Sequence, residues 1–177
     1  MHAGTAEREK EFDILMARML KQHPQFGEKQ EVRDDALQQS ILLGEQILEQ
    51  SGFSVPQAFH DAAQVARKRV VGGSARAFTP FDLSPDNIIV AEKTNFLDYE
   101  WAGFRDVSFD IACVVAGFPQ FVFTHPITDE EADTFISAWK REIKEVFPNL
   151  VEPHNLHARV LAALVGWGLS TLATMSA

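Results

Sequence analysis

The sequence predicts a mainly α-helical domain with a small β-hairpin near its middle. Apolar residues recur at helical spacing in long stretches on both sides of residues 76–103. Two short apolar runs, residues 88–91 and 95–97, are joined by the polar sequence Glu92-Lys93-Thr94, which is typical of a hairpin. A length of 177 residues fits a single domain, residues 1–177, with its own hydrophobic core.

The N-terminal segment, residues 1–71, is predicted to form three helices. Apolar residues follow a helical period over residues 5–22, 32–50 and 56–70. Proline and glycine separate these stretches, at Pro24 to Gly27 and at Gly52 to Pro56, and such residues commonly end helices.

The C-terminal segment, residues 106–177, is also predicted to be helical. A short buried helix is expected over residues 106–117. Thr128 and Glu131 have the spacing of a capping box, which starts a helix. That helix carries the clearest apolar stripe of the chain, formed by Ala132, Phe135, Ile136, Trp139, Ile143 and Val146. A last apolar helix is expected from about Pro153 to the end.

Composition narrows the classes of function. A formal net charge of −9 argues against a nucleic-acid-binding surface, which needs a basic patch. A single cysteine, Cys113, excludes an internal disulfide and fits a reducing cytoplasm. Charged residues 7–11 interrupt any signal peptide. The uncharged stretch 160–175 is shorter than a membrane span and contains glycine, serine and threonine, so we expect a buried helix and no membrane contact.

The residues with the clearest chemistry flank the predicted hairpin. Asp82 lies five positions before Asn87, an apolar run follows, and Asp98 comes directly after the second run. The hairpin would bring Asn87 alongside Asp98. A carboxylate that orients a hydroxyl, with an amide and a second carboxylate that bind Mg²⁺, is the arrangement used in phosphoryl transfer.

Three motifs in this region resemble those of the aminoglycoside phosphotransferase and choline/ethanolamine kinase superfamily. The sequence Asp-Leu-Ser-Pro-Asp-Asn-Ile-Ile-Val at 82–90 resembles the catalytic loop of the family. Leu-Asp-Tyr-Glu-Trp-Ala-Gly at 97–103 resembles its metal-binding segment, and Phe-Asp-Ile-Ala at 109–112 resembles the start of its next helix. The three motifs occur in the family's order, so together they are specific.

The resemblance implies a protein-kinase-like C-terminal lobe and a role for each matching residue. Asp82 would be the catalytic carboxylate, and Asn87 and Asp98 would bind the Mg²⁺ of Mg²⁺–ATP. Asp110 would support the catalytic loop by hydrogen bonding to its backbone. Glu100 and Ser84 are secondary candidates for the site. The implied reaction transfers a phosphoryl group from ATP to the hydroxyl of a small molecule.

Two departures from the family pattern bear on activity. Pro80-Phe81 replaces the usual His-Gly before the catalytic Asp, and proline cannot donate a backbone hydrogen bond. The N-terminal β lobe that covers ATP is also missing, because residues 1–71 show no strand pattern. We therefore predict a phosphotransferase-family protein with impaired or no turnover as this chain alone. The alternative is a non-catalytic binding or assembly module. In either case the face left by the missing lobe would suit a second copy or another partner.

Overall fold

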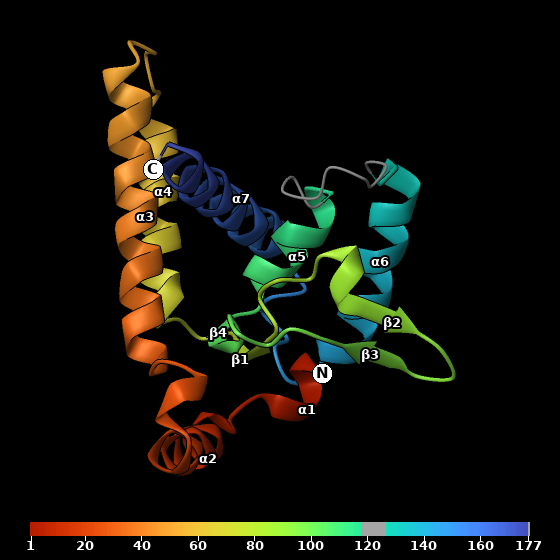
Figure 1. Cartoon of the computed structure of the whole chain (residues 1–177). Coiled ribbons are helices and arrows are strands. Elements are labelled where there is room, and N and C mark those ends of the chain that lie inside the picture. Colours follow the sequence, from red (N-terminus) through yellow and green to blue (C-terminus); the bar gives the residue numbers. More distant parts are fainter. Residues whose placement is uncertain (118–126, 177) are drawn as a thin grey trace.

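The computed structural model describes residues 1–117 and 127–176, with short antiparallel β pairs among predominantly helical elements. This confirms the predicted fold class of a mainly helical domain with a small β element. In Figure 1 the long helices α3 and α4 stand on one side, and α7 crosses from them towards α5. The strands, α1 and α6 lie on the other side.

The described elements follow in this order along the chain, with the helices given first and the strands after them. The helices are α1 (His2–Thr5), α2 (Glu9–Gln22), α3 (Gln30–Gln50), α4 (Gln57–Val71), α5 (Ser108–Val115), α6 (Asp129–Ile143) and α7 (Pro153–Met175), with short 3₁₀ turns at Pro24–Phe26 and Pro85–Asn87. The strands are β1 (Arg76–Thr79), β2 (Ile88–Val90), β3 (Thr94–Phe96) and β4 (Gly103–Asp106).

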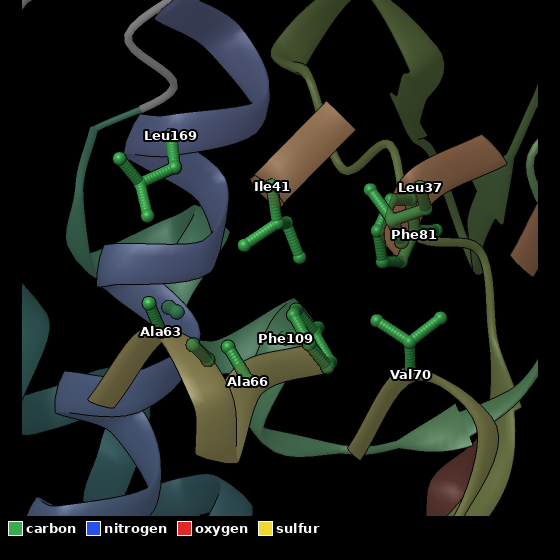
Figure 2. Packing of buried hydrophobic residues seen from close by; sticks show 10 residues of the cluster. Leu37, Ile41, Ala63, Ala66, Val70, Phe81, Phe109 and Leu169 are labelled. Carbon is green, nitrogen blue, oxygen red and sulfur yellow. The ribbon is translucent and has the colours of Figure 1, made fainter. Parts of the chain in front are cut away.

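The main hydrophobic core lies where α3, α4, α5 and α7 meet. Figure 2 shows side chains from these helices facing one another, with Phe81 and Phe109 closing the cluster near Val70. Small residues let the backbones approach closely. A Cβ added at Gly44 of α3 would lie 2.0 Å from the backbone oxygen of Leu169 in α7. Glycine is therefore required at this crossing, and α7 is held tightly against α3.

A second core lies between the strands and α6. It contains Ala75, Ala77, Val107, Ile143, Leu150 and Leu156. The capping box predicted for α6 is present, because Thr128 Oγ1 accepts from the Glu131 backbone N–H while Glu131 accepts from that of Thr128. The Glu131 carboxylate accepts from both the backbone N–H and the hydroxyl of Thr128, and these two hydrogen bonds lower the pKa of Glu131 from its ordinary value. Ile136, Trp139 and Ile143 of the predicted α6 stripe pack in this second core, which also contains Ala77 of β1.

The predicted hairpin is present, but a second β pair was missed. β2 pairs antiparallel with β3, in the register Ile88 with Phe96. β1 also pairs antiparallel with β4, with Thr79 opposite Gly103. The sequence conceals this pair because β4 carries Arg105 and Asp106, both fully buried, whose charges suggest a solvated segment.

Two predicted helix boundaries were also wrong. The helix expected over residues 5–22 is divided, because Glu7 has a φ of 65°, and α1 ends at Thr5 before α2 begins. Thr5 Oγ1 accepts a hydrogen bond from the Phe78 backbone N–H, which ties α1 to β1. The helix expected from Asp106 begins at Ser108 instead. Asp106 completes β4, and its Oδ1 accepts from the backbone N–H of Ser108.

Helix α7 is long and apolar enough, by length and composition, to cross a membrane, with a mean hydropathy of 1.4 in its most apolar window. It nevertheless packs in the core, where Ala162, Ala163, Gly166, Leu169 and Ala173 are buried. One face of α7 is therefore buried, whereas Leu161 and Met175 are exposed, so the prediction of a buried helix holds for that face alone. This packing is compatible with a soluble protein. Cytoplasmic localisation stays a prediction.

The crossing of α3 and α7 generates a stability prediction. Gly44→Ala places a methyl group against the Leu169 backbone, and we expect the free energy of unfolding to fall by about 1–3 kcal/mol. Gly168→Ala is the matched control, because no atom lies within 4 Å of its added Cβ. Since alanine favours a helix over glycine, this variant should gain about 0.5–1 kcal/mol. Urea unfolding followed by circular dichroism measures the free energy of unfolding of both variants. Equal changes in the two would contradict the close packing of Gly44 against Leu169.

Candidate functional site

Two loops that carry the candidate residues connect the same two β pairs. Residues 80–87 run from β1 to β2, and residues 97–102 run from β3 to β4. Because β1 pairs antiparallel with β4 and β2 with β3, the start of each loop lies beside the end of the other. Antiparallel partners lie about 5 Å apart, so the loops are neighbours at both ends. We call residues 80–87 the Asp82 loop and residues 97–102 the Asp98 loop.

Asn87 is the residue that joins the two loops. Its backbone oxygen accepts a hydrogen bond of 2.7 Å from the N–H of Leu97, the residue before Asp98. Its side-chain Nδ2 lies 3.5 Å from the backbone oxygen of Asp82, at the long limit for a hydrogen bond. The predicted approach of Asn87 to the Asp98 segment is therefore present in the backbone.

The two carboxylates differ in their surroundings. Asp82 is half-buried, and its Oδ1 accepts from the backbone N–H of Ser84 at 3.2 Å. Asp98 is exposed, and its side chain makes no hydrogen bond or ion pair with the residues that the structure describes. The Asp98 carboxylate therefore has no competing partner among the described residues, whereas the Asp82 carboxylate has one.

Strained backbone marks both loops. Phe81 and Asp98 have φ values of 70° and 51°, in the left-handed region that side chains other than glycine rarely adopt. Each such residue costs roughly 1–3 kcal/mol and persists only where surrounding contacts hold it. Such strain clusters at functional sites, and here it falls directly before Asp82 and at Asp98.

The aromatic side chain of Phe81 explains how one strained position is held. The ring is 4% exposed and stacks on Trp167, with centroids 4.6 Å apart and planes at 27°. The Phe109 ring lies 5.7 Å away, and the Arg105 guanidinium lies 4.6 Å from the Phe81 ring on its face. Phenylalanine at this position therefore anchors the Asp82 loop to the core.

The side chains of the secondary candidates, Ser84 and Glu100, do not point to a role in the site. Ser84 Oγ donates to Asp86, so the hydroxyl is engaged within its own loop. The Glu100 side chain is exposed, and its backbone oxygen accepts from Arg33. Of the two residues, only the backbone N–H of Ser84 contacts Asp82, and the Glu100 side chain makes no hydrogen bond or ion pair with Asp82 in the described part of the chain.

Asp110 supports the fold in a different way from that implied by the resemblance. It is fully buried, but its Oδ2 accepts from Nε2 of His2 at 2.9 Å and not from the backbone of the Asp82 loop. Its Oδ1 has no hydrogen-bond partner among the described residues. Nδ1 of His2 accepts from Trp139 Nε1 at 3.0 Å, so Nε2 carries the proton. The contact predicted for Asp110 is therefore wrong, because α1 brings an imidazole to that carboxylate.

The sequence analysis missed two residues that shape this region, His2 and Arg105. Their partners lie far away in the sequence: Asp110 for His2, and Asp34 with Trp101 for Arg105. For Arg105 the one local signal was its place, with Asp106, between the apolar residues Phe104 and Val107.

The fit of the site to Mg²⁺ rests on its donor set. In the described residues no three His, Cys, Asp or Glu side chains group as metal ligands. Asp82, Asn87 and Asp98 offer two carboxylates and one amide, all oxygen donors of the kind that Mg²⁺ prefers, and Mg²⁺ needs few protein ligands because it retains several waters. The residues therefore fit a nucleotide-borne Mg²⁺ better than an all-protein metal cage.

Two hollows on the surface of the described residues lie away from these loops. A groove of about 320 Å³ is lined by Leu48, Phe59, Leu164, Val165, Gly168, Leu169 and Leu172, from α3, α4 and α7. Another, of about 270 Å³, is lined by residues of α3 and α4. Neither supplies a wall to Asp82 or Asp98.

Comparison of the chain with protein-family models, curated proteins and solved structures finds no match. The likeness of residues 82–112 to phosphotransferase motifs therefore stands on the residues themselves.

Cys113 lies beneath the Asp82 loop, in contact with Leu83. Burial raises the pKa of the Cys113 thiol to about 12, and the negative charges of Asp110 and Asp82 act in the same direction, against a hydrogen bond with the Leu83 backbone. Because the folded pKa exceeds the unfolded value, folding favours the thiol. The resulting stability is complete below about pH 9 and is lost as the pH rises towards 12.

We expect Cys113 to resist alkylation in the folded protein. At pH 8 the thiolate is the reactive form, and the folded chain holds almost none. Iodoacetamide should therefore react with Cys113 at least tenfold more slowly than with a short cysteine peptide, and urea should remove the difference. Alkylation at the peptide's rate without urea would contradict the burial of this side chain.

Proposed function

We propose that the Asp82 and Asp98 loops form the floor of a phosphotransferase site that binds Mg²⁺–ATP and faces the hydroxyl of a small molecule. The observation that carries the proposal is the nested pairing of the strands, which sets the two loops side by side with Asn87 between them. The order of the motifs at 82–90, 97–103 and 109–112 supports the same function.

Each residue has a definite task in this proposal. Asn87 Oδ1 and the Asp98 carboxylate bind the cation, and Asp82 accepts or orients the proton of the attacking hydroxyl. Mg²⁺, when bound, neutralises charge on the phosphates. Asp82 is restrained by Ser84, which limits the orientations that the carboxylate samples.

The same loops account for weak or absent turnover by this chain alone. Residues 80–87 and 97–102 contain Asp82, Asp86, Asp98 and Glu100 but no lysine or arginine. Phosphoryl transfer needs positive charge on the transferred group in addition to the metal. We therefore expect binding of Mg²⁺–ATP to be measurable while turnover is slow or undetectable.

A non-catalytic binding or assembly module is the second candidate, and exposed apolar side chains favour it. Ile89, Val90, Leu97, Tyr99 and Trp101 are between 42% and 80% exposed on or beside the two loops. Apolar side chains gathered in this way often mark an interface. A concentration-dependent dimer in size-exclusion chromatography with light scattering would support a second copy at this face. A monomer at every concentration would contradict it.

Calorimetry with Mg²⁺–ATP tests the proposed function. Asp98→Ala removes one metal ligand, and we expect the affinity to fall roughly tenfold or more. Glu92→Ala is the matched control, because it removes the same charge from the exposed hairpin turn, and its affinity should stay within about twofold of the unmodified chain.

Two results would count against this proposal. Absence of binding by the unmodified chain would contradict nucleotide binding directly. Equal losses in the two variants would show that overall negative charge, and not ligation by Asp98, attracts the cation.

A further inference from the structure

Arg105 contacts both the Asp82 loop and the Asp98 loop. It lies in β4 and is 1% exposed. Its Nη1 donates to the backbone oxygen of Trp101, in the Asp98 loop, at 2.6 Å. The face of its guanidinium packs on the ring of Phe81, the residue before Asp82. One side chain therefore links the backbone of one loop to the other.

Helix α3 also contributes hydrogen bonds to the backbone of the Asp98 loop. Arg33 donates to the backbone oxygens of Glu100 and Ala102, on either side of Trp101. Two arginines thus hold three consecutive carbonyl groups. Gln30, on the same face of α3, exchanges two hydrogen bonds with the backbone of Phe104.

Asp34 fixes the orientation of Arg105. Its Oδ1 accepts from Arg105 Nε at 2.7 Å and lies 2.7 Å from Nη2, while its Oδ2 accepts from Gln30 Nε2 at 3.0 Å. Burial lowers the pKa of Arg105 from its ordinary value, and the charge of Asp34 opposes that shift. Since Asp34 neutralises the guanidinium, Arg105 adds little positive charge to the site above it.

We propose that Arg105 is a positioning residue that sets the Asp98 loop against the Asp82 loop. A lysine would retain the charge opposite Asp34 but lacks the planar guanidinium of arginine. That group contacts the Asp34 carboxylate, the Trp101 carbonyl and the Phe81 ring at the same time. Arg105 holds the loops in this way in the protein without ligand. The effect of this loop position on Mg²⁺–ATP affinity rests on the proposed function.

The alternative is that Arg105 stabilises the fold as a whole, as many buried ion pairs do. The two roles predict different patterns of amide exchange. The Ala102 N–H donates to the Tyr99 backbone oxygen inside the Asp98 loop, at 3.0 Å, and reports on that loop alone. Amides of Ala162 and Leu169 in α7 report on the main core. Global destabilisation accelerates exchange at the α7 amides and at the Ala102 amide. Release of the loop accelerates exchange at the Ala102 amide alone.

The experiment compares Arg105→Lys with Arg159→Lys. Arg159 donates to the buried carboxylate of Asp106 at 2.6 Å and, among the described residues, makes no hydrogen bond or ion pair with either loop, so it is a matched ion-pair control. Hydrogen exchange followed by NMR in metal-free buffer is the first measurement. We expect the Ala102 amide of Arg105→Lys to exchange at least tenfold faster, with α7 amides changed no more than in Arg159→Lys.

Phe81→Leu is the second variant if Arg105→Lys does not fold. It leaves the pair of Arg105 with Asp34 and removes the aromatic face, and it should also accelerate exchange at Ala102 selectively. In either variant, acceleration of the Ala102 and α7 amides by the same factor would overturn the proposal.

Mg²⁺–ATP affinity supplies the second measurement. We expect about a tenfold loss in Arg105→Lys and less than a twofold change in Arg159→Lys. If the unmodified chain does not bind Mg²⁺–ATP, the proposed function fails, and the exchange data still decide the role of Arg105. If the chain binds and Arg105→Lys binds equally well despite a released loop, the link from loop position to the site is wrong.

Discussion

The candidate site depends on one constraint, the nesting of one antiparallel pair inside another. β2 and β3 pair within the segment bounded by β1 and β4, and the hydrogen bond from Leu97 N–H to Asn87 O extends the inner pair into both loops. A two-stranded sheet alone is marginally stable in water. Here the outer pair is buried between α1, α3, α4 and α6, so the helical core supplies the stability that the loops lack.

Buried charges join the outer pair to the helices. Arg105 pairs with Asp34 of α3, and Asp106 accepts from Arg159 of α7 with Arg69 of α4 at 4.0 Å. Asp110, just beyond β4, pairs with His2 of α1. Removing one member of such a pair leaves the other buried and uncompensated, which is strongly destabilising. The segment that carries the candidate site is thus located by directional contacts from several elements, and not by apolar packing alone.

These same contacts explain how far sequence analysis reached. The hairpin, the capping box of Thr128 and the long helices follow from local patterns, and the approach of Asn87 to Asp98 follows from the hairpin. The β1–β4 pair was missed because Arg105 and Asp106 resemble surface residues until Asp34 and Arg159, which are 71 and 53 positions away, are known to face them. The break after Thr5, at Glu7 with its φ of 65°, was also missed, and the hydrogen bond that ties Thr5 to Phe78 spans 73 positions. Long-range pairing leaves no periodic signal in the sequence.

The central claim is that Asp82, Asn87 and Asp98 present their oxygens to one cation. A titration of the ¹⁵N-labelled chain with Mn²⁺, in the presence of ATP, tests it most directly, because a bound paramagnetic ion broadens the amide signals nearest to it. The account predicts that signals from residues 82–87 and 97–100 broaden together at the lowest Mn²⁺ concentrations. Earlier broadening at the acidic first turn of α6, where Asp129, Glu130 and Glu131 lie, would contradict it.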